Sequence, residues 1–98
     1  MRVELSALAE SDLEEIADYI AQDSPAHAVD FIRRLGAKLT VIGEHPLVYR
    51  LRPEIGEDAR VAFVGRYAIL FRISDHLVRV ERVANGARDL PSVYGSAN

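Results

Sequence analysis

The hydrophobic pattern of this chain changes its period once, and that change constrains the fold more than any other feature. Over the first 43 residues, apolar side chains recur every three or four positions, as they do in helices that bury one face. Beyond residue 60 the pattern has a period of two, which indicates strands. We therefore predict a helical first half, followed by short antiparallel strands.

Capping residues locate the predicted helices. Ser6 is a suitable N-cap for the first helix, and Ser24 and Pro25 supply an N-cap and a first-turn proline for the second. Gly43 can adopt the left-handed conformation that ends a helix, so we expect the second helix to stop there. Gly36 costs about 1 kcal/mol relative to alanine, which a close approach of the two helices would offset. We expect a helical hairpin joined by three or four residues.

The remaining predicted elements are strands and one long loop. Residues 44–59 contain prolines, a glycine and no clear period, and we expect a loop there with an edge strand near residues 48–51. Strand patterns lie at residues 3–5, 61–64, 67–73 and 77–83. This order predicts a single α+β domain over residues 1–98. It would be a two-layer sandwich, β-α-α-β-β-β, in which the N-terminal strand and the helical hairpin pack on a small antiparallel sheet.

Charge is distributed unevenly along the chain. The first 30 residues carry eight acidic side chains and one basic side chain, whereas the remaining residues carry eleven basic and seven acidic ones. Ten of these eleven are arginines, whose planar forks pair well with carboxylates and phosphates. Two interpretations stay open: a solvated acidic helix with ordinary surface arginines, or a basic sheet that receives an acidic partner or nucleic acid.

The sequence offers no support for several classes of site. There is no cysteine, which removes disulfides and thiolate chemistry, and no apolar run approaches 18 residues, so we expect a cytoplasmic protein without membrane contact. His27, His45 and His76 have no partners at metal-ligand spacing. No Ser–His–Asp set, phosphate loop or carboxylate pair stands out. We therefore expect no metal, no cofactor and no catalytic residue.

The arginines of the second half are the set with the most chemical interest. Those on or beside predicted strands are Arg60, Arg66, Arg72, Arg79, Arg82 and Arg88. Such a cluster can neutralise nucleic-acid phosphates, stabilise the charge on an attacked RNA phosphate, or bind the carboxylates of an acidic peptide. Strand alternation places Arg82 on the face of Val78 and Val80. We expect Arg82 at the sheet margin or paired with an acid, because unpaired burial is costly.

The C-terminal residues allow two interpretations each. Arg88 and Asp89 can form a structural ion pair, or Asp89 can cap a helix. Tyr94 can assist a proton transfer or act as a docking aromatic, and we favour the second.

Three segments of the sequence resemble the RelE/ParE superfamily of toxin–antitoxin toxins, and more closely its ParE branch. They are Ala9-x-x-Asp12-Leu13-x-x-Ile16-x-x-Tyr19-Ile20, Ser24-Pro25-x-x-Ala28 and Arg82-Val83-x-x-Gly86-x-Arg88-Asp89. The resemblance covers roughly residues 3 to 90. The single lysine and the acidic net charge also favour ParE, because small nucleases that bind ribosomes are usually strongly basic. Asn85 departs from the pattern, since a histidine often precedes this glycine in related sequences, which argues against a catalytic role there.

The resemblance implies a toxin that a cognate antitoxin neutralises. RelE-like members are ribosome-dependent endoribonucleases that cut mRNA. ParE-like members share the fold without that catalytic set, act on DNA gyrase, block replication and stabilise plasmids. In both branches, a disordered antitoxin tail folds across the groove and sheet of the toxin. For this chain the resemblance implies a ParE-like toxin that inhibits DNA gyrase by binding.

The resemblance also suggests which arginines bind which partner. We expect the target to contact Arg60, Arg82, Arg88 and Tyr94. We expect an acidic or amphipathic antitoxin tail to contact Arg66, Arg72 and Arg79, and no direct sequence-specific binding of nucleic acid. Two alternatives stay open: a RelE-like mRNA endoribonuclease whose centre combines Arg60, Arg82 and Tyr94, and a harmless family member that only binds a partner.

Overall fold

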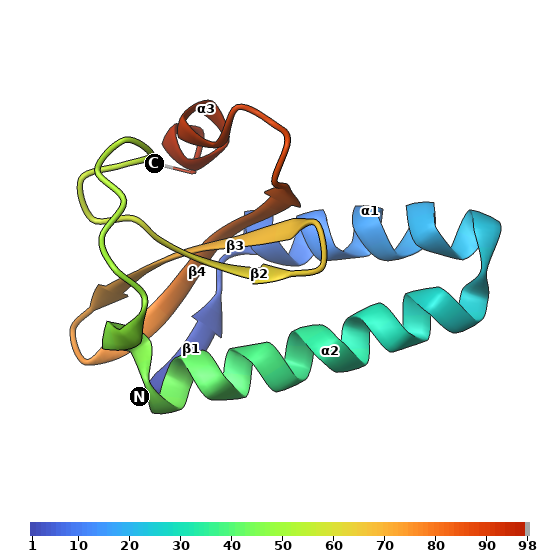
Figure 1. The fold of residues 1–98 in the computed structure, drawn as a ribbon, viewed down its shortest axis with the longest axis horizontal. Helices are drawn as coiled ribbons and strands as arrows, with labels where there is room; N and C mark the ends of the chain where they lie inside the picture. The colour runs from blue at the N-terminus through green and yellow to red at the C-terminus, as the bar shows by residue number, and fades with distance from the viewer. Residues whose placement is uncertain (98) are drawn as a thin grey trace.

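The helices and strands follow the predicted order. The computed structural model describes residues 1–97, and Figure 1 shows a long helical hairpin lying along one side of a twisted sheet. The elements in chain order are β1 (Arg2–Leu5), α1 (Ala7–Asp23), α2 (Pro25–Glu44), the short 3-10 helix η1 (Pro46–Val48), β2 (Arg60–Val64), β3 (Tyr67–Ser74), β4 (Leu77–Asn85) and α3 (Leu90–Gly95). The predicted α+β fold is confirmed.

The four strands form one sheet in the order β1-β4-β3-β2. β2, β3 and β4 are antiparallel neighbours, as expected. β1 also belongs to the sheet, where it pairs in parallel with the first half of β4, from Arg2 opposite Leu77 to Leu5 opposite Val80. The sheet is therefore mixed and not purely antiparallel. Parallel neighbours require a long crossover connection, which the hairpin, β2 and β3 supply here.

Serine side chains begin both long helices, as the sequence predicts. The Ser6 hydroxyl accepts a hydrogen bond from the Ala9 N–H at 3.0 Å and donates one to the Glu81 carbonyl at 2.7 Å, so it also fastens α1 to β4. The Ser24 hydroxyl accepts from the His27 N–H at 3.2 Å. Ser24 alone joins the two helices, so the connection is shorter than the three or four residues expected.

The expected roles of two glycines in α2 are wrong. Gly36 is exposed, and a Cβ added to it would meet no atom within 4 Å, so the helices do not approach each other closely there. Gly43 is helical and does not take the left-handed conformation. A Cβ on Gly43 would lie 2.8 Å from the Met1 carbonyl oxygen. The glycine is thus needed because the N-terminal residue crosses α2 at this point.

Each face of the sheet carries a hydrophobic core. The larger core lies between the sheet and the hairpin and includes Phe31, Ile42, Ile69, Phe71 and Val80. The smaller one lies on the opposite face, where Val93 and Tyr94 of α3 and Ile55 of the loop before β2 cover Ala68 and Leu70. In Figure 1, α3 sits across the sheet from the hairpin. The two-layer sandwich therefore has a local third layer.

A bulge between β3 and β4 changes the face of Arg82. Phe71 pairs with Val80, but Leu70 pairs with Arg82, so Glu81 is the additional residue. Arg82 consequently shares the α3 side of the sheet with Leu70, while Val80 faces the hairpin. The expectation that Arg82 shares the face of Val80 is wrong, because simple alternation assumes an unbroken ladder.

Residues 45–59 form the long segment that joins α2 to β2. The edge strand expected near residues 48–51 is wrong, since η1 occupies the start of this segment and one isolated bridge, between Leu51 and Arg60, follows it. Within residues 1–97, every helix is too short or too polar to cross a membrane.

Candidate functional site

Arg82 lies where β4 extends beyond β1. β1 pairs with β4 only as far as Val80, and Asp12 of α1 meets the free edge that follows. The Asp12 carboxylate accepts hydrogen bonds from Arg82 Nε at 2.8 Å, from Arg82 Nη2 at 2.9 Å and from the Val83 N–H at 2.9 Å. The Arg82 and Asp12 side chains are only 15% and 11% exposed. The expectation that Arg82 is paired at the sheet margin is confirmed.

The same guanidinium holds the C-terminal helix. Arg82 Nη1 donates to Ser96 Oγ at 2.6 Å and to the Val93 carbonyl at 3.4 Å. The hydrogen bonds that Arg82 donates to the Asp12 carboxylate raise the pKa of Arg82, so the guanidinium stays charged. Arg82 therefore connects α1, β4 and the end of α3, and its charged head is directed into the fold.

Glu81 neutralises two arginines of the expected antitoxin-binding set. Its carboxylate lies 2.8 Å from Arg79 Nε and 3.3 Å from Arg72 Nε, and its side chain is 5% exposed. Arg72 and Arg79 are opposite each other in the sheet, on neighbouring strands. Two like charges so placed would repel each other, and the buried carboxylate between them offsets this repulsion. An antitoxin acid that reached these arginines would compete with Glu81.

Tyr94 is buried under the loop that precedes β2. It is 4% exposed, and its hydroxyl donates a hydrogen bond to Asp58 Oδ1 at 2.7 Å. Burial, together with the hydrogen bond to Asp58, raises the pKa of the Tyr94 phenol above its ordinary value. A Cβ on Gly56 would lie 2.6 Å from the Tyr94 ring, which shows how closely the loop covers it. The ring docks within this chain, against the smaller core.

Arg60 and Arg88, the other residues of the expected target-binding set, lie in different surroundings. Arg60 donates from Nη1 to the Tyr49 carbonyl and so pins the loop before β2. Arg88 is exposed beside a depression of about 330 Å³, whose lining includes Arg82 and Ser92. Asp89 caps α3 by accepting from the Ser92 N–H and hydroxyl, so the helix-cap interpretation is confirmed. The structure brings Arg82 and Arg88 together, but it engages Arg60 and Tyr94 elsewhere.

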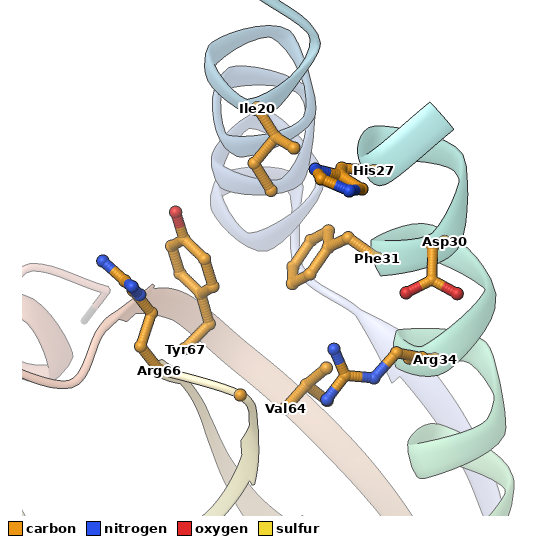
Figure 2. A pocket seen from close by; sticks show the side chains of 9 residues that line it. Ile20, His27, Asp30, Phe31, Arg34, Val64, Arg66 and Tyr67 are labelled. Carbon is orange, nitrogen blue, oxygen red and sulfur yellow. The ribbon is translucent and has the colours of Figure 1, made fainter. Parts of the chain in front are cut away.

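Arg66 leads to a groove that the sequence did not reveal. It lies with Arg34 and His27 around a pocket of about 270 Å³, between the hairpin and the turn that joins β2 to β3. Figure 2 shows the Phe31 and Tyr67 rings inside this pocket, with Arg34 and Arg66 on opposite sides of it. The two rings meet edge to face, with centroids 5.1 Å apart. The pocket thus has an apolar floor, and its rim carries the basic side chains of Arg34 and Arg66 together with the carboxylate of Asp30.

A second depression continues this pocket along α2. It is about 350 Å³ in volume, shares Arg34 with the first pocket, and adds Lys38, Val41 and the half-exposed Phe63. We call the two together the hairpin–sheet groove. A sequence signal for it exists, because His27, Arg34 and Val41 recur every seven residues and so share one side of α2. The arginines expected to bind a partner all lie on or beside strands, so this stripe on α2 was not predicted as a binding surface.

The described residues offer nothing that would hold a metal ion. Among residues 1–97, no group of three or more His, Cys, Asp or Glu side chains has the proximity that metal binding needs. The five ion pairs of this part of the chain join acids to arginines, and all buried polar side-chain atoms there have hydrogen-bond partners.

The comparison with protein families identifies the family of this chain. The family model described as the ParE toxin of the type II toxin–antitoxin system parDE matches residues 3–90. The chain belongs to the ParE toxin family. No curated protein matches its sequence.

Two solved structures are similar to this ParE-family chain. The chromosomal ParDE toxin–antitoxin system from P. aeruginosa aligns over 87% of this chain and 95% of that chain, with a TM-score of 0.74 and 17% identity. The RelBE2 toxin–antitoxin complex from Mycobacterium tuberculosis aligns over 86% and 95%, with a TM-score of 0.56 and 26% identity. The ParE and RelE branches therefore share this fold, and the chain is a toxin of a type II toxin–antitoxin system with an antitoxin as its partner.

Proposed function

We propose that this ParE-family toxin inhibits DNA gyrase by binding to it and catalyses no reaction of its own. The observation that carries the proposal is the match to the ParE family over residues 3–90, since ParE-like toxins act on gyrase whereas RelE-like toxins cut mRNA. The net charge of −3 supports it, because a nuclease that works on ribosomal RNA gains affinity from a basic surface. The proposed location is the cytoplasm, where gyrase and its DNA are found.

The chemistry of the sheet also favours binding over catalysis. A RelE-like centre would need Arg60, Arg82 and Tyr94 to reach one RNA phosphate. In this fold Arg60 bonds to a loop carbonyl, Arg82 to a carboxylate of α1, and Tyr94 to Asp58. A buried phenol with a raised pKa is also a poor proton-transfer group near neutral pH.

We place the gyrase-binding surface around Arg88, at the C-terminal end of β4. Arg88 is exposed and takes part in no ion pair within residues 1–97, so its guanidinium is available to an acidic surface or to a phosphate. Arg82 stabilises this surface, because its hydrogen bonds to Val93 and Ser96 hold α3 beside Arg88. In this account Arg88 contacts the target directly, and Arg82 is a positioning residue.

We place the antitoxin tail in the hairpin–sheet groove. Arg34, Lys38 and Arg66 suit the acidic side chains of such a tail, and the exposed ring of Phe63 suits its apolar ones. A disordered tail that folds into the groove would bind tightly and still be removable by proteolysis of the free antitoxin. Of the three arginines expected to bind the antitoxin, Arg66 lies in this groove, and Arg72 and Arg79 pair with Glu81 on the α3 side.

A supercoiling assay with purified toxin, gyrase and plasmid DNA tests the proposal. We expect inhibition by the wild type, a loss of at least tenfold in potency for Arg88→Ala, and no loss for Arg50→Ala, an exposed arginine on the loop before β2. Arg34→Glu should keep its potency against gyrase and lose its neutralisation by antitoxin. Equal potency of Arg88→Ala and wild type would remove Arg88 from the target surface.

A further inference from the structure

The helical hairpin has an apolar face that no other part of residues 1–97 covers. A depression of about 430 Å³ lies between α1 and α2 near their connection, and it shares no residue with the hairpin–sheet groove. Its lining is almost entirely apolar and consists of Ala17, Asp18, Ala21, Pro25, Ala28, Val29 and Ile32. Val29 is 59% exposed and Ile32 is 44% exposed. We call this surface the hairpin face.

Charged residues border the hairpin face in an arrangement that complements itself. On α1, Glu14 and Asp18 are one turn apart, and on α2 Arg33 follows Val29 by one turn. All three charged side chains belong to exposed residues, and none takes part in an ion pair within residues 1–97. Like charges one turn apart destabilise a helix, so α1 would gain from a cation placed between Glu14 and Asp18.

We infer that the hairpin face binds a second copy of this chain in a two-fold symmetric dimer, with α1 of each copy packed against α2 of the other. α1 carries six acidic residues and no basic one, whereas α2 carries three basic and two acidic residues. Packing α1 on its own copy would bring like charges together, so electrostatics select the arrangement with α1 against α2. A two-fold axis parallel to the helices produces that arrangement in both halves of the interface.

The positions of the charges along the helices fit this symmetry. Arg33 lies nine residues after Ser24, and Glu14 and Asp18 lie ten and six residues before it. With a rise of about 1.5 Å per residue, Arg33 stands at a height between Glu14 and Asp18. The axis therefore places Arg33 of each copy beside the two acids of the other, on either side of a centre formed by Val29 and the small residues of α1.

The size of the hairpin face is sufficient for a modest dimer. A helix of 17 residues is about 25 Å long and about 10 Å wide, so two adjacent helices present about 500 Å² per copy. The two copies together bury about 1,000 Å², which is near the lower limit for a specific interface. We therefore expect an equilibrium between monomer and dimer.

Sedimentation velocity of the purified full chain tests the inference. The wild type should change from monomer to dimer between about 1 and 500 μM, the range expected for an interface near the lower size limit. Two charge-reversed variants, Glu14→Arg with Asp18→Arg in one chain and Arg33→Glu in another, should each dimerise at least tenfold more weakly. Glu57→Arg, an exposed charge reversal on the loop before β2, is the matched control and should dimerise like the wild type.

Mixing the two charge-reversed variants gives the decisive result. An equimolar mixture should form a heterodimer with about the affinity of the wild type, because each new charge then meets its opposite across the interface. Rescue by mixing also shows that both variants are folded. A wild type that stays monomeric over this range would overturn the inference. This holds also if added antitoxin proves to cover the hairpin face of that monomer. The inference would also be overturned by a wild-type dimer that the variants leave unchanged, or by variants that stay monomeric when mixed.

Discussion

Replacing Asp12 with alanine tests whether the link between α1 and β4 is a main source of stability. The substitution leaves the Arg82 guanidinium with only Ser96 and the Val93 carbonyl as partners, and it removes the acceptor of the Val83 N–H. Removing one member of a buried ion pair costs about 3–5 kcal/mol, and orphaning a buried N–H costs about 1–3 kcal/mol. Because the pair is slightly exposed and Arg82 keeps two partners, we expect a loss of about 3 kcal/mol.

Urea and thermal unfolding, both followed by far-ultraviolet circular dichroism, measure this loss. In a domain of this size, 1 kcal/mol corresponds to about 4–8 °C in Tm, so Asp12→Ala should lower Tm by about 12–24 °C. Asp23→Ala, which removes an exposed acid at the other end of the same helix, should change the free energy of unfolding by less than about 0.5 kcal/mol. A double-mutant cycle with Arg82→Ala should give a coupling energy of about 1.5–3 kcal/mol. A loss below about 1 kcal/mol for Asp12→Ala would refute the structural role given to the pair.

Three further predictions concern stability. Gly36→Ala should stabilise the protein by about 1 kcal/mol because its Cβ meets no atom, whereas Gly43→Ala should destabilise it by about 1–3 kcal/mol because its Cβ would lie 2.8 Å from the Met1 carbonyl oxygen. Glu81→Ala should cost about 1–3 kcal/mol, since two arginines then face each other without a carboxylate. Burial raises the pKa of Tyr94 above that of an unfolded phenol, so its contribution is complete below about pH 10 and is lost as the pH rises further. Tyr94→Phe should reduce that alkaline loss.

The same unfolding experiments can contradict each of these predictions. Equal effects of the two glycine substitutions would mean that the crossing of α2 by the N-terminal residue is not a constraint. Glu81→Ala at wild-type stability would mean that the arginine pair needs no counter-charge. An alkaline loss of stability that is the same in Tyr94→Phe and the wild type would assign that loss to other groups.

Local signals in the sequence were enough to predict the order of elements. The serines before α1 and α2 identify the helix starts because a cap acts within three residues of itself. The period of two identified the three antiparallel strands because alternation is also a local pattern, contained within each strand. The pairing of β1 with β4 joins residues that are about 75 positions apart, and no pattern within either strand specifies it. The roles of Gly36 and Gly43 depend likewise on which segment passes nearby.

The candidate site was predictable in its composition but not in its arrangement. The sequence showed that the second half is rich in arginine, and it indicated that Arg82 must be paired. It could not show that the acid is Asp12, 70 residues away, or that a bulge at Glu81 turns Arg82 to the α3 side. The basic side chains of the hairpin–sheet groove were missed because two of them, Arg34 and Lys38, come from α2 and not from a strand. Whether Arg88 contacts the target stays a prediction.

Two reactions, run with the same preparation of folded toxin, distinguish inhibition of gyrase from cleavage of mRNA. One is the supercoiling of plasmid DNA by purified gyrase, and the other is translation in a cell extract programmed with mRNA. We predict that the toxin stops supercoiling, that its antitoxin restores supercoiling, and that mRNA on the ribosomes stays intact. Unimpaired supercoiling at toxin concentrations well above that of gyrase, with ribosome-dependent cleavage of mRNA, would contradict this prediction.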